Sequence, residues 1–146
     1  MRRTFIFLKP ETLERSLVRP VMKRLTDAGF CIETLDYVRV TEDKILLHYD
    51  EVIRREGEAF RSRILRCYVD RWILPVILSG ESETIISDVR SLIGATDPSK
   101  ALPGTIRGDL ATDSMEAAIR EDRPCENLIH ASDSEISFEY ETGLWL

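Results

Sequence analysis

The order of the predicted elements indicates an α+β fold of the split βαβ type. Two further observations support one domain over residues 1–146. A chain of 146 residues can bury a core without disulfides or metal ions, and its 43% apolar and 32% charged residues are typical of a soluble globular protein. The predicted order is strand, helix, strand, two helices, strand, helix, long loop and strand.

In the first half, alternating apolar residues mark the strands, and capping residues mark the helices. Pro20 suits the first turn of a helix and Gly29 suits its end, while Thr41 is a plausible N-cap. The predicted elements are a strand over 3–9, a turn at 12–16, a helix over 20–28, a strand over 30–40, and helices over 42–49 and 59–69.

In the second half, the apolar run over 72–79 predicts a buried strand. Because proline cannot donate a ladder hydrogen bond, Pro75 predicts that one side of this strand is irregular or at an edge. The remaining predicted elements are a helix capped by Ser82 and ended by Gly94, a long loop over 95–113, a short helix over 115–121, a strand beginning at 128–129, and a helix over 135–141.

Composition excludes several classes of protein. The net charge of −6 is a poor basis for a general nucleic-acid binder, so we expect no obligatory nucleic-acid partner. No apolar run approaches the roughly 20 residues of a membrane span. The three cysteines, Cys31, Cys67 and Cys125, are odd in number and far apart, which argues against a disulfide framework or a zinc site. We therefore expect a cytoplasmic protein without a membrane partner.

The predicted loop over 95–113 is the first indication of function. Structureless loops of this length are uncommon inside compact domains unless they bind a ligand. Its glycines would let the backbone approach a ligand closely, and its threonines and Arg107 suit a phosphate. No P-loop motif accompanies it. A plain surface loop rich in glycine and proline is an equally good interpretation of this segment alone.

Several segments together resemble the nucleoside diphosphate kinase family. The octapeptide 127–134 (NLIHASDS) is similar to the active-site signature of that family. Four other segments match in the right order: 8–11 (LKPE), 94–98 (GATDP), 103–109 (PGTIRGD) and 141–146 (ETGLWL). The resemblance implies a ferredoxin-like α+β domain with a four-stranded antiparallel sheet covered by helices. It also implies γ-phosphoryl transfer between nucleoside tri- and diphosphates, such as ATP and GDP, by a ping-pong mechanism with Mg²⁺ on the nucleotide phosphates.

By this resemblance, His130 is the nucleophile that becomes phosphorylated. An imidazole nitrogen is nucleophilic near neutral pH, and its phosphorylated form is a good leaving group. Glu141 matches the carboxylate that holds the other ring nitrogen, and Ser132 matches a second hydrogen-bonding partner. Glu141 could instead be an ordinary carboxylate on a helix face. His48, the other histidine, is interpreted as a structural residue of a polar helix.

The resemblance also assigns a set of nucleotide-binding residues. Two arginines would hold phosphate oxygens, a threonine and a tyrosine hydroxyl would lie near the phosphates, a lysine and an asparagine would contact the ribose hydroxyls, and an aromatic ring would stack on the base. These residues are Arg90, Arg107, Thr96, Tyr49, Lys9, Asn127 and Phe60. Arg90 could instead be a solvated charge beside Asp88, and Phe60 could be a core residue.

Two segments depart from the family pattern, near 66–75 and 110–126, where the chain is longer than usual. We expect a surface insertion at 110–126. Family resemblance predicts a homo-oligomer, either a hexamer or a tetramer. A non-catalytic nucleotide-binding or interaction protein on the same fold is the alternative, and a regulatory domain for a small ligand is a third hypothesis.

Overall fold

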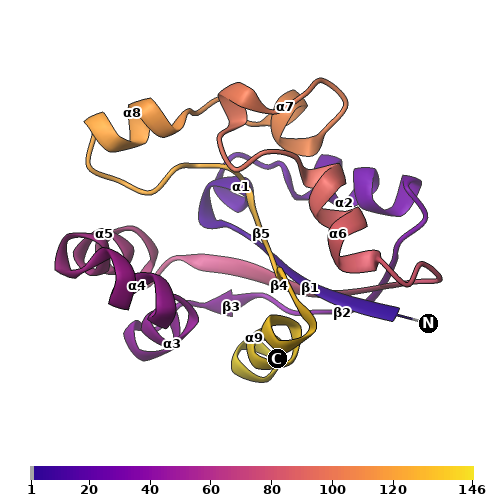
Figure 1. Ribbon diagram of the computed structural model, residues 1–146, viewed down its shortest axis with the longest axis horizontal. Helices are drawn as coiled ribbons and strands as arrows, with labels where there is room; N and C mark the ends of the chain where they lie inside the picture. The colour runs from indigo at the N-terminus through magenta and orange to yellow at the C-terminus, as the bar shows by residue number, and fades with distance from the viewer. Residues whose placement is uncertain (1) are drawn as a thin grey trace.

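An antiparallel sheet forms the centre of the protein in the computed structural model, which describes residues 2–146 (Figure 1). Its strands lie in the order β2-β4-β1-β5, and a short strand, β3, pairs with the first residues of β4. The strands are β1 (Arg2–Leu8), β2 (Cys31–Leu35), β3 (Val38–Arg39), β4 (Trp72–Gly80) and β5 (Ile129–Ala131). The predicted α+β class with a four-stranded antiparallel sheet is therefore confirmed.

Helices cover both faces of this sheet. One face carries α1 (Pro10–Glu14), α2 (Val18–Asp27), α6 (Ile85–Ile93), the 3₁₀ turn η1 (Pro98–Lys100) and α7 (Ile106–Leu110). The other face carries α3 (Glu42–His48), α4 (Asp50–Glu56), α5 (Glu58–Tyr68) and α9 (Glu135–Trp145), and α8 (Met115–Arg120) lies above α5 in Figure 1. None of the helices within residues 2–146 is long and apolar enough to cross a membrane.

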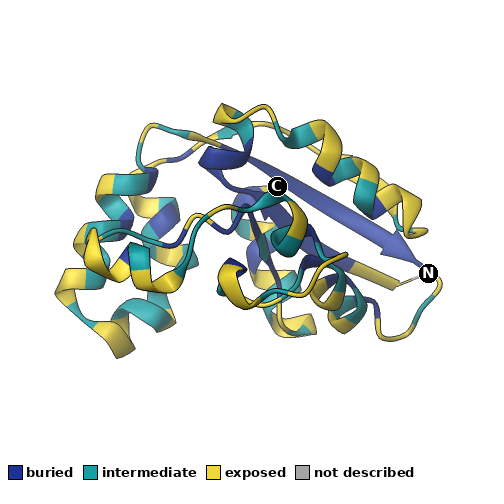
Figure 2. Ribbon diagram, turned by 90° about the horizontal axis from the view of Figure 1, so that it is seen from above, coloured by how far each residue is buried: buried dark blue, intermediate teal, exposed yellow. Residues whose placement is uncertain are grey.

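Alternation along β1 divides the core into two layers. Ile6 and Leu8 pack with α2 and α6, whereas Phe5 and Phe7 pack with α3, α5 and α9. Successive side chains of a strand point to opposite faces, so the part of β1 that lies between the two helical layers, residues 5–8, is apolar at every position. Strands β1 and β4 are buried over most of their length, whereas the residues of β2 are exposed (Figure 2).

The predicted long loop is only partly irregular, which corrects the sequence-based prediction. Residues 95–113 contain η1 and α7. The side chain of Asp97 accepts a hydrogen bond from the Ser99 N–H, and that of Thr105 accepts one from the Gly108 N–H. Such short capped turns lack the apolar periodicity by which a helix is identified from sequence.

Several predicted boundaries are also wrong. Residues 50–56 form α4, which the sequence did not indicate, because none of its residues is buried and it has no apolar stripe. The strand predicted over 30–40 is divided into β2 and β3, and α9 continues four residues beyond 141 to Trp145. Helix α2 begins at Val18 rather than Pro20, since the first-turn N–H groups of a helix have no intrahelical partners and proline is tolerated there.

The start of α6 and the position of Pro75 also differ from the sequence-based predictions. Ser82 does not cap α6, which begins at Ile85; its hydroxyl instead donates to Asp88 at 2.6 Å. Pro75 lies in the inner strand β4, so an edge position is wrong, but the alternative of an irregular neighbour is confirmed. The Asp36 N–H donates to the Pro75 carbonyl at the point where β2 ends and before β3 begins.

Candidate active site

A cavity of about 950 Å³ lies where β1 and β5 meet α3, α6 and α9. Eight of the ten side chains predicted for the site line it, although they come from segments spread over the whole chain. They are Lys9, Tyr49, Arg90, Thr96, Arg107, Asn127, His130 and Glu141. Ser132 lies behind the cavity wall, where it is fully buried, and Phe60 is also outside the lining.

The backbone before His130 is fixed by the first helix. Leu128 has a φ of +74°, which is unusual for a residue with a branched side chain. Its N–H donates to the Glu11 carboxylate at 3.1 Å, and its carbonyl accepts from the Thr12 hydroxyl at 2.7 Å and the Lys9 N–H at 2.8 Å. Three contacts from residues 9–12 thus hold this conformation and direct His130 into the cavity.

The ring of His130 has one nitrogen occupied. Its Nε2 lies 2.8 Å from Oε1 of Glu141, which also accepts a 2.5 Å hydrogen bond from the Ser132 hydroxyl. Glu141 is positioned by α9, whose first turn is capped by Ser134. Because an ionised carboxylate can only accept, Nε2 must carry the proton, and in the neutral ring Nδ1 is left with its lone pair. The His130 ring also packs on the ring of Phe7, with centroids 4.9 Å apart and an interplanar angle of 32°.

His48 lies against His130, which the sequence did not predict. The two rings are perpendicular, with centroids 4.5 Å apart, and His48 Nδ1 accepts a 3.1 Å hydrogen bond from the indole N–H of Trp145. Burial and the neighbouring charges of His130 and Lys9 hold the pKa of His48 well below its usual range, so this ring is neutral at physiological pH. No local signal identifies this role, because Trp145 is 97 positions away.

Among the described residues, His48, His130 and Glu141 form one group whose ligand atoms lie within 4.8 Å of one another, as in a metal site. The hydrogen bonds oppose that interpretation. An indole N–H can only donate, so Nδ1 of His48 is unprotonated and its Nε2 carries the proton. The carboxylate is already shared between His130 and Ser132. These three side chains are therefore arranged to hold protons rather than a metal ion.

Arg107 connects three backbone segments at the cavity wall. Its guanidinium donates to the carbonyls of Asn127 at 3.0 Å, Gly94 at 3.0 Å and Ile129 at 2.6 Å. Burial lowers the pKa of Arg107 to about 10, which leaves the group charged at neutral pH. A guanidinium has five N–H donors, so two remain for a ligand. Gly108 is required in this loop, because a Cβ there would lie 2.2 Å from the Leu102 carbonyl oxygen.

Arg90 lies on the other side of the nucleophile. Its guanidinium donates to the carbonyl of Ala131 at 2.9 Å, immediately after His130. Asp88 bonds instead to the hydroxyls of Ser82 and Thr84. The geometry therefore favours a role for Arg90 in the cavity over a solvated charge paired with Asp88.

Lys9, Asn127 and Thr96 form a hydrogen-bonded chain along the cavity wall. The Lys9 ammonium donates to Oδ1 of Asn127 at 2.9 Å and to the Cys125 carbonyl at 3.1 Å, and the Asn127 amide donates to the Thr96 carbonyl at 2.9 Å. Burial lowers the pKa of Lys9 from its usual value. The site thus brings three cations, Lys9, Arg90 and Arg107, to the cavity that contains His130.

Comparison with known proteins agrees with this geometry. A family model described as nucleoside diphosphate kinase matches residues 2–146. The chain belongs to the nucleoside diphosphate kinase family. A nucleoside diphosphate kinase of Streptococcus pneumoniae (strain P1031) is 38% identical over 146 residues, which cover 99% of each chain. That of Roseiflexus sp. (strain RS-1) is 35% identical over 145 residues, covering 99% of this chain and 87% of the relative.

Solved structures give the same assignment. A nucleoside diphosphate kinase from Borrelia burgdorferi with bound vanadate and ADP, a transition-state mimic, superposes with a TM-score of 0.91 at 28% identity, over 99% of this chain and 86% of that one. The enzyme of Halobacterium salinarum in complex with CDP gives 0.81 at 28% identity, over 99% and 87%. This nucleoside diphosphate kinase family member is thus a phosphotransferase by homology as well as by fold.

The region predicted to bind the base is built differently from the phosphate site of this kinase. Tyr49 lines the cavity, its hydroxyl lies 3.2 Å from that of Tyr68, and burial raises its pKa to about 12, so it is a neutral hydroxyl. Phe60 packs edge-on against Tyr49, with centroids 6.0 Å apart, and Arg63 lies over its ring. The structure therefore places Phe60 beside the cavity rather than in its wall.

Proposed function

We propose that the chain transfers the γ-phosphoryl group of a nucleoside triphosphate to a nucleoside diphosphate through phospho-His130. One observation carries this proposal: Glu141 holds Nε2 of His130 at 2.8 Å, which leaves the Nδ1 lone pair in a cavity lined by three cationic side chains. A nucleophile with a fixed tautomer and surrounding positive charge is what phosphoryl transfer requires.

In the first half-reaction, the Nδ1 lone pair attacks the γ-phosphorus, and the bond to the bridging oxygen breaks with its electrons leaving on the nucleoside diphosphate. In the second, a terminal oxygen of another diphosphate attacks the same phosphorus, and the P–N electron pair returns to Nδ1. Positive charge grows on the ring during the first step, and the Glu141 carboxylate stabilises it. Ser132 holds that carboxylate in place through its 2.5 Å hydrogen bond.

The cationic residues would bind the phosphates. The two free N–H groups of Arg107 and the guanidinium of Arg90 suit phosphoryl oxygens, with the hydroxyls of Thr96 and Tyr49 as further donors. We assign the ribose hydroxyls to Lys9 and Asn127. We retain Phe60 as the surface on which the base stacks, because its ring adjoins Tyr49 at the cavity.

The donor set of the cavity fits a metal ion that arrives on the nucleotide. Four acidic side chains line the cavity: Asp50 pairs with Arg54, Asp133 accepts from Ser137, Glu141 is shared between His130 and Ser132, and the fourth, Glu51, is exposed. We propose that Mg²⁺ is held mainly by the nucleotide phosphates and needs no direct protein ligand. It supplies positive charge beside the phosphates when bound.

Labelling with γ-³²P-ATP in the absence of an acceptor tests the proposed route. The unmodified protein should acquire acid-labile, alkali-stable label, GDP should remove it as labelled GTP, and His130→Ala should acquire none. A protein that turns over nucleotides without ever carrying label, or a labelled His130→Ala variant, would contradict it. Lack of both label and turnover in the unmodified protein would favour the alternative, a non-catalytic nucleotide-binding protein.

The remaining family-based predictions stay proposals. We propose a single domain over residues 1–146, with segments near 66–75 and 110–126 longer than is usual in the family. We also propose a homo-oligomer, either a hexamer or a tetramer, and a cytoplasmic location. Sedimentation equilibrium distinguishes the two assemblies by mass.

A further inference from the structure

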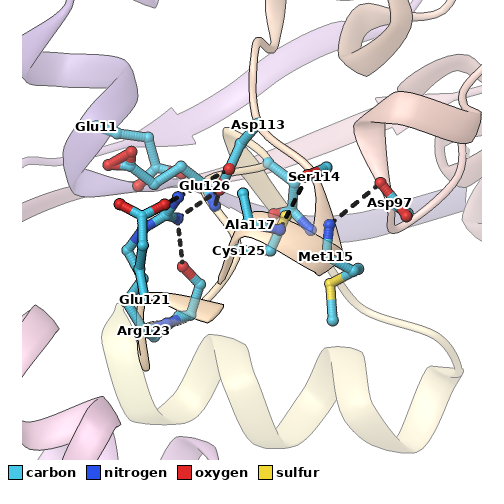
Figure 3. A network of polar contacts seen from close by, with 12 residues as sticks. Glu11, Asp97, Asp113, Ser114, Met115, Ala117, Glu121, Arg123, Cys125 and Glu126 are labelled. Atoms are coloured by element: carbon cyan, nitrogen blue, oxygen red, sulfur yellow. Dashed lines mark hydrogen bonds and ion pairs between the residues drawn. The ribbon is translucent and has the colours of Figure 1, made fainter. Parts of the chain in front are cut away.

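An ion-pair network folds the segment 110–126 back on itself (Figure 3). The Asp113 carboxylate accepts two hydrogen bonds from Arg123, at 2.6 and 2.9 Å, and one from the Glu126 N–H at 2.8 Å. Its side chain is only 9% exposed, and the bidentate guanidinium holds the pKa of this carboxyl well below its usual range. We call this arrangement of Asp113, Arg123 and the Glu126 N–H the clamp.

The segment 110–126, which contains the clamp, contacts the nucleotide site at two points. On one side, the Met115 N–H donates to the Asp97 carboxylate at 3.3 Å, next to Thr96 in the cavity (Figure 3). On the other side, Cys125 directly precedes Glu126, and its carbonyl accepts from the Lys9 ammonium at 3.1 Å. The segment 110–126 therefore adjoins residues that line the cavity.

Both hydrogen-bond acceptors of the Lys9 side chain lie at the end of this segment or directly after it. Its buried ammonium bonds to the Cys125 carbonyl and to Oδ1 of Asn127, the residues on either side of Glu126. A buried ammonium is costly without acceptors of fixed geometry, because three donors must be satisfied. The position of residues 125–127 therefore determines the positions of the Lys9 and Asn127 side chains. The N–H of Glu126, in the middle of that stretch, donates to the Asp113 carboxylate.

We propose that Asp113 and Arg123 are positioning residues of the nucleotide site, which act through residues 125–127 on Lys9 and Asn127. The proposal rests on the proposed function, since it needs Lys9 and Asn127 to contact the nucleotide. The clamp touches neither His130 nor Glu141, so it should determine how tightly a nucleotide is held more than how fast the phosphoryl group moves once the nucleotide is in place.

Asp113→Asn is the direct test, because it keeps the shape of the side chain and removes its charge. The KM for the nucleotide should rise about tenfold, while kcat at saturation stays within about threefold. Arg123→Lys, which keeps the charge and loses the bidentate geometry, should give an intermediate KM. If the clamp acts as a unit, the double variant Asp113→Asn with Arg123→Met should raise KM no more than the more damaging of these two substitutions made alone.

Asp122→Asn is the matched control, because Asp122 lies on the same segment and pairs with Arg63 at 3.1 Å, but its side chain is 68% exposed. Its left-handed φ of 51° suits asparagine. This variant should leave KM within twofold. An unchanged KM in Asp113→Asn, with or without a lower thermal midpoint, would overturn the proposal and leave the clamp a role in stability alone. If Asp113→Asn does not fold, Arg123→Lys decides by the same criterion.

Binding of ADP, measured by calorimetry in the His130→Ala background, separates this inference from the proposed function. A tenfold higher Kd for ADP on adding Asp113→Asn supports the positioning role of the clamp even if His130 proves not to be the nucleophile. An equal Kd in both proteins refutes the clamp even if His130 is phosphorylated.

Discussion

Replacing Glu141 by glutamine tests the function of the carboxylate behind the nucleophile. The change keeps the size of the side chain and removes the charge from an acceptor 2.8 Å from Nε2 of His130. Both side chains are largely buried, with exposed fractions of 22% for His130 and 10% for Glu141, so solvent screens the pair only in part. A hydrogen bond to a charged group contributes about 1.5–3 kcal/mol and a neutral one about 1 kcal/mol. The expected loss, the difference of about 0.5–2 kcal/mol, corresponds to a phosphorylation rate about 2–30-fold lower.

The rate of His130 phosphorylation is measured by rapid quench with labelled ATP at saturation, so that binding does not enter. Glu141→Ala should be slower than Glu141→Gln, because it also releases the tautomer and leaves Nε2 unpaired. Ser132→Ala is a milder companion, since it removes one donor to the carboxylate and keeps its charge. Rates within twofold of the unmodified protein for both Glu141 variants would refute the reasoning, provided that circular dichroism shows both to be folded.

Three further predictions concern stability and nucleotide binding. Arg107→Lys removes the planar guanidinium that bonds three backbone carbonyls. Urea denaturation should therefore show a free energy of unfolding about 2–4 kcal/mol lower, and ADP should bind more weakly. An unchanged free energy of unfolding would contradict this role. His48 stays neutral when folded but protonates when unfolded, so stability should fall below about pH 6.5 by up to about 1.4 kcal/mol per pH unit. His48→Asn, which keeps an acceptor for Trp145, should lack that part of the pH dependence; an identical pH profile would refute the assignment. Gly108→Ala places a Cβ against the Leu102 carbonyl, so the protein should lose about 1–3 kcal/mol of stability and its thermal midpoint should fall. An unchanged midpoint would refute the close contact.

Local patterns predicted the strands well because burial imposes a simple rule. Between the two helical layers, residues 5–8 of β1 are all apolar and buried, and the apolar run within residues 3–9 carries that signal. The same reasoning failed for α4, which buries none of its residues, and for α7, which is one turn capped by Thr105. Periodicity reports burial, so elements that bury little are not visible to it.

The candidate site divides in a similar way. His130, Arg107 and Lys9 lie in segments whose residue order is itself distinctive, and the cavity brings them together. His48 has no such local signal, because its role comes from contacts with His130 and Trp145 far along the chain. A histidine in a polar helix is usually structural, and only the tertiary fold places this one against the nucleophile.

The three backbone contacts of Arg107 could not be predicted either. The sequence indicated that Arg107 binds phosphate, whereas in the fold its guanidinium also bonds the backbone carbonyls of residues 94, 127 and 129. The dependence of Lys9 on the segment 110–126 is of the same kind. A longer-than-usual stretch was expected to be a surface insertion, and its contact with the site appears only in three dimensions.

Identifying the atom that carries the phosphoryl group is the most direct test of the central claim. Phosphorylated protein with ¹⁵N-labelled histidine can be studied by NMR, in which coupling between phosphorus and a ring nitrogen identifies the bonded atom. The structure predicts the phosphoryl group on Nδ1 of His130, with Nε2 still protonated and bound to Glu141. A phosphoryl group on Nε2, on His48, or on any other residue would contradict the account.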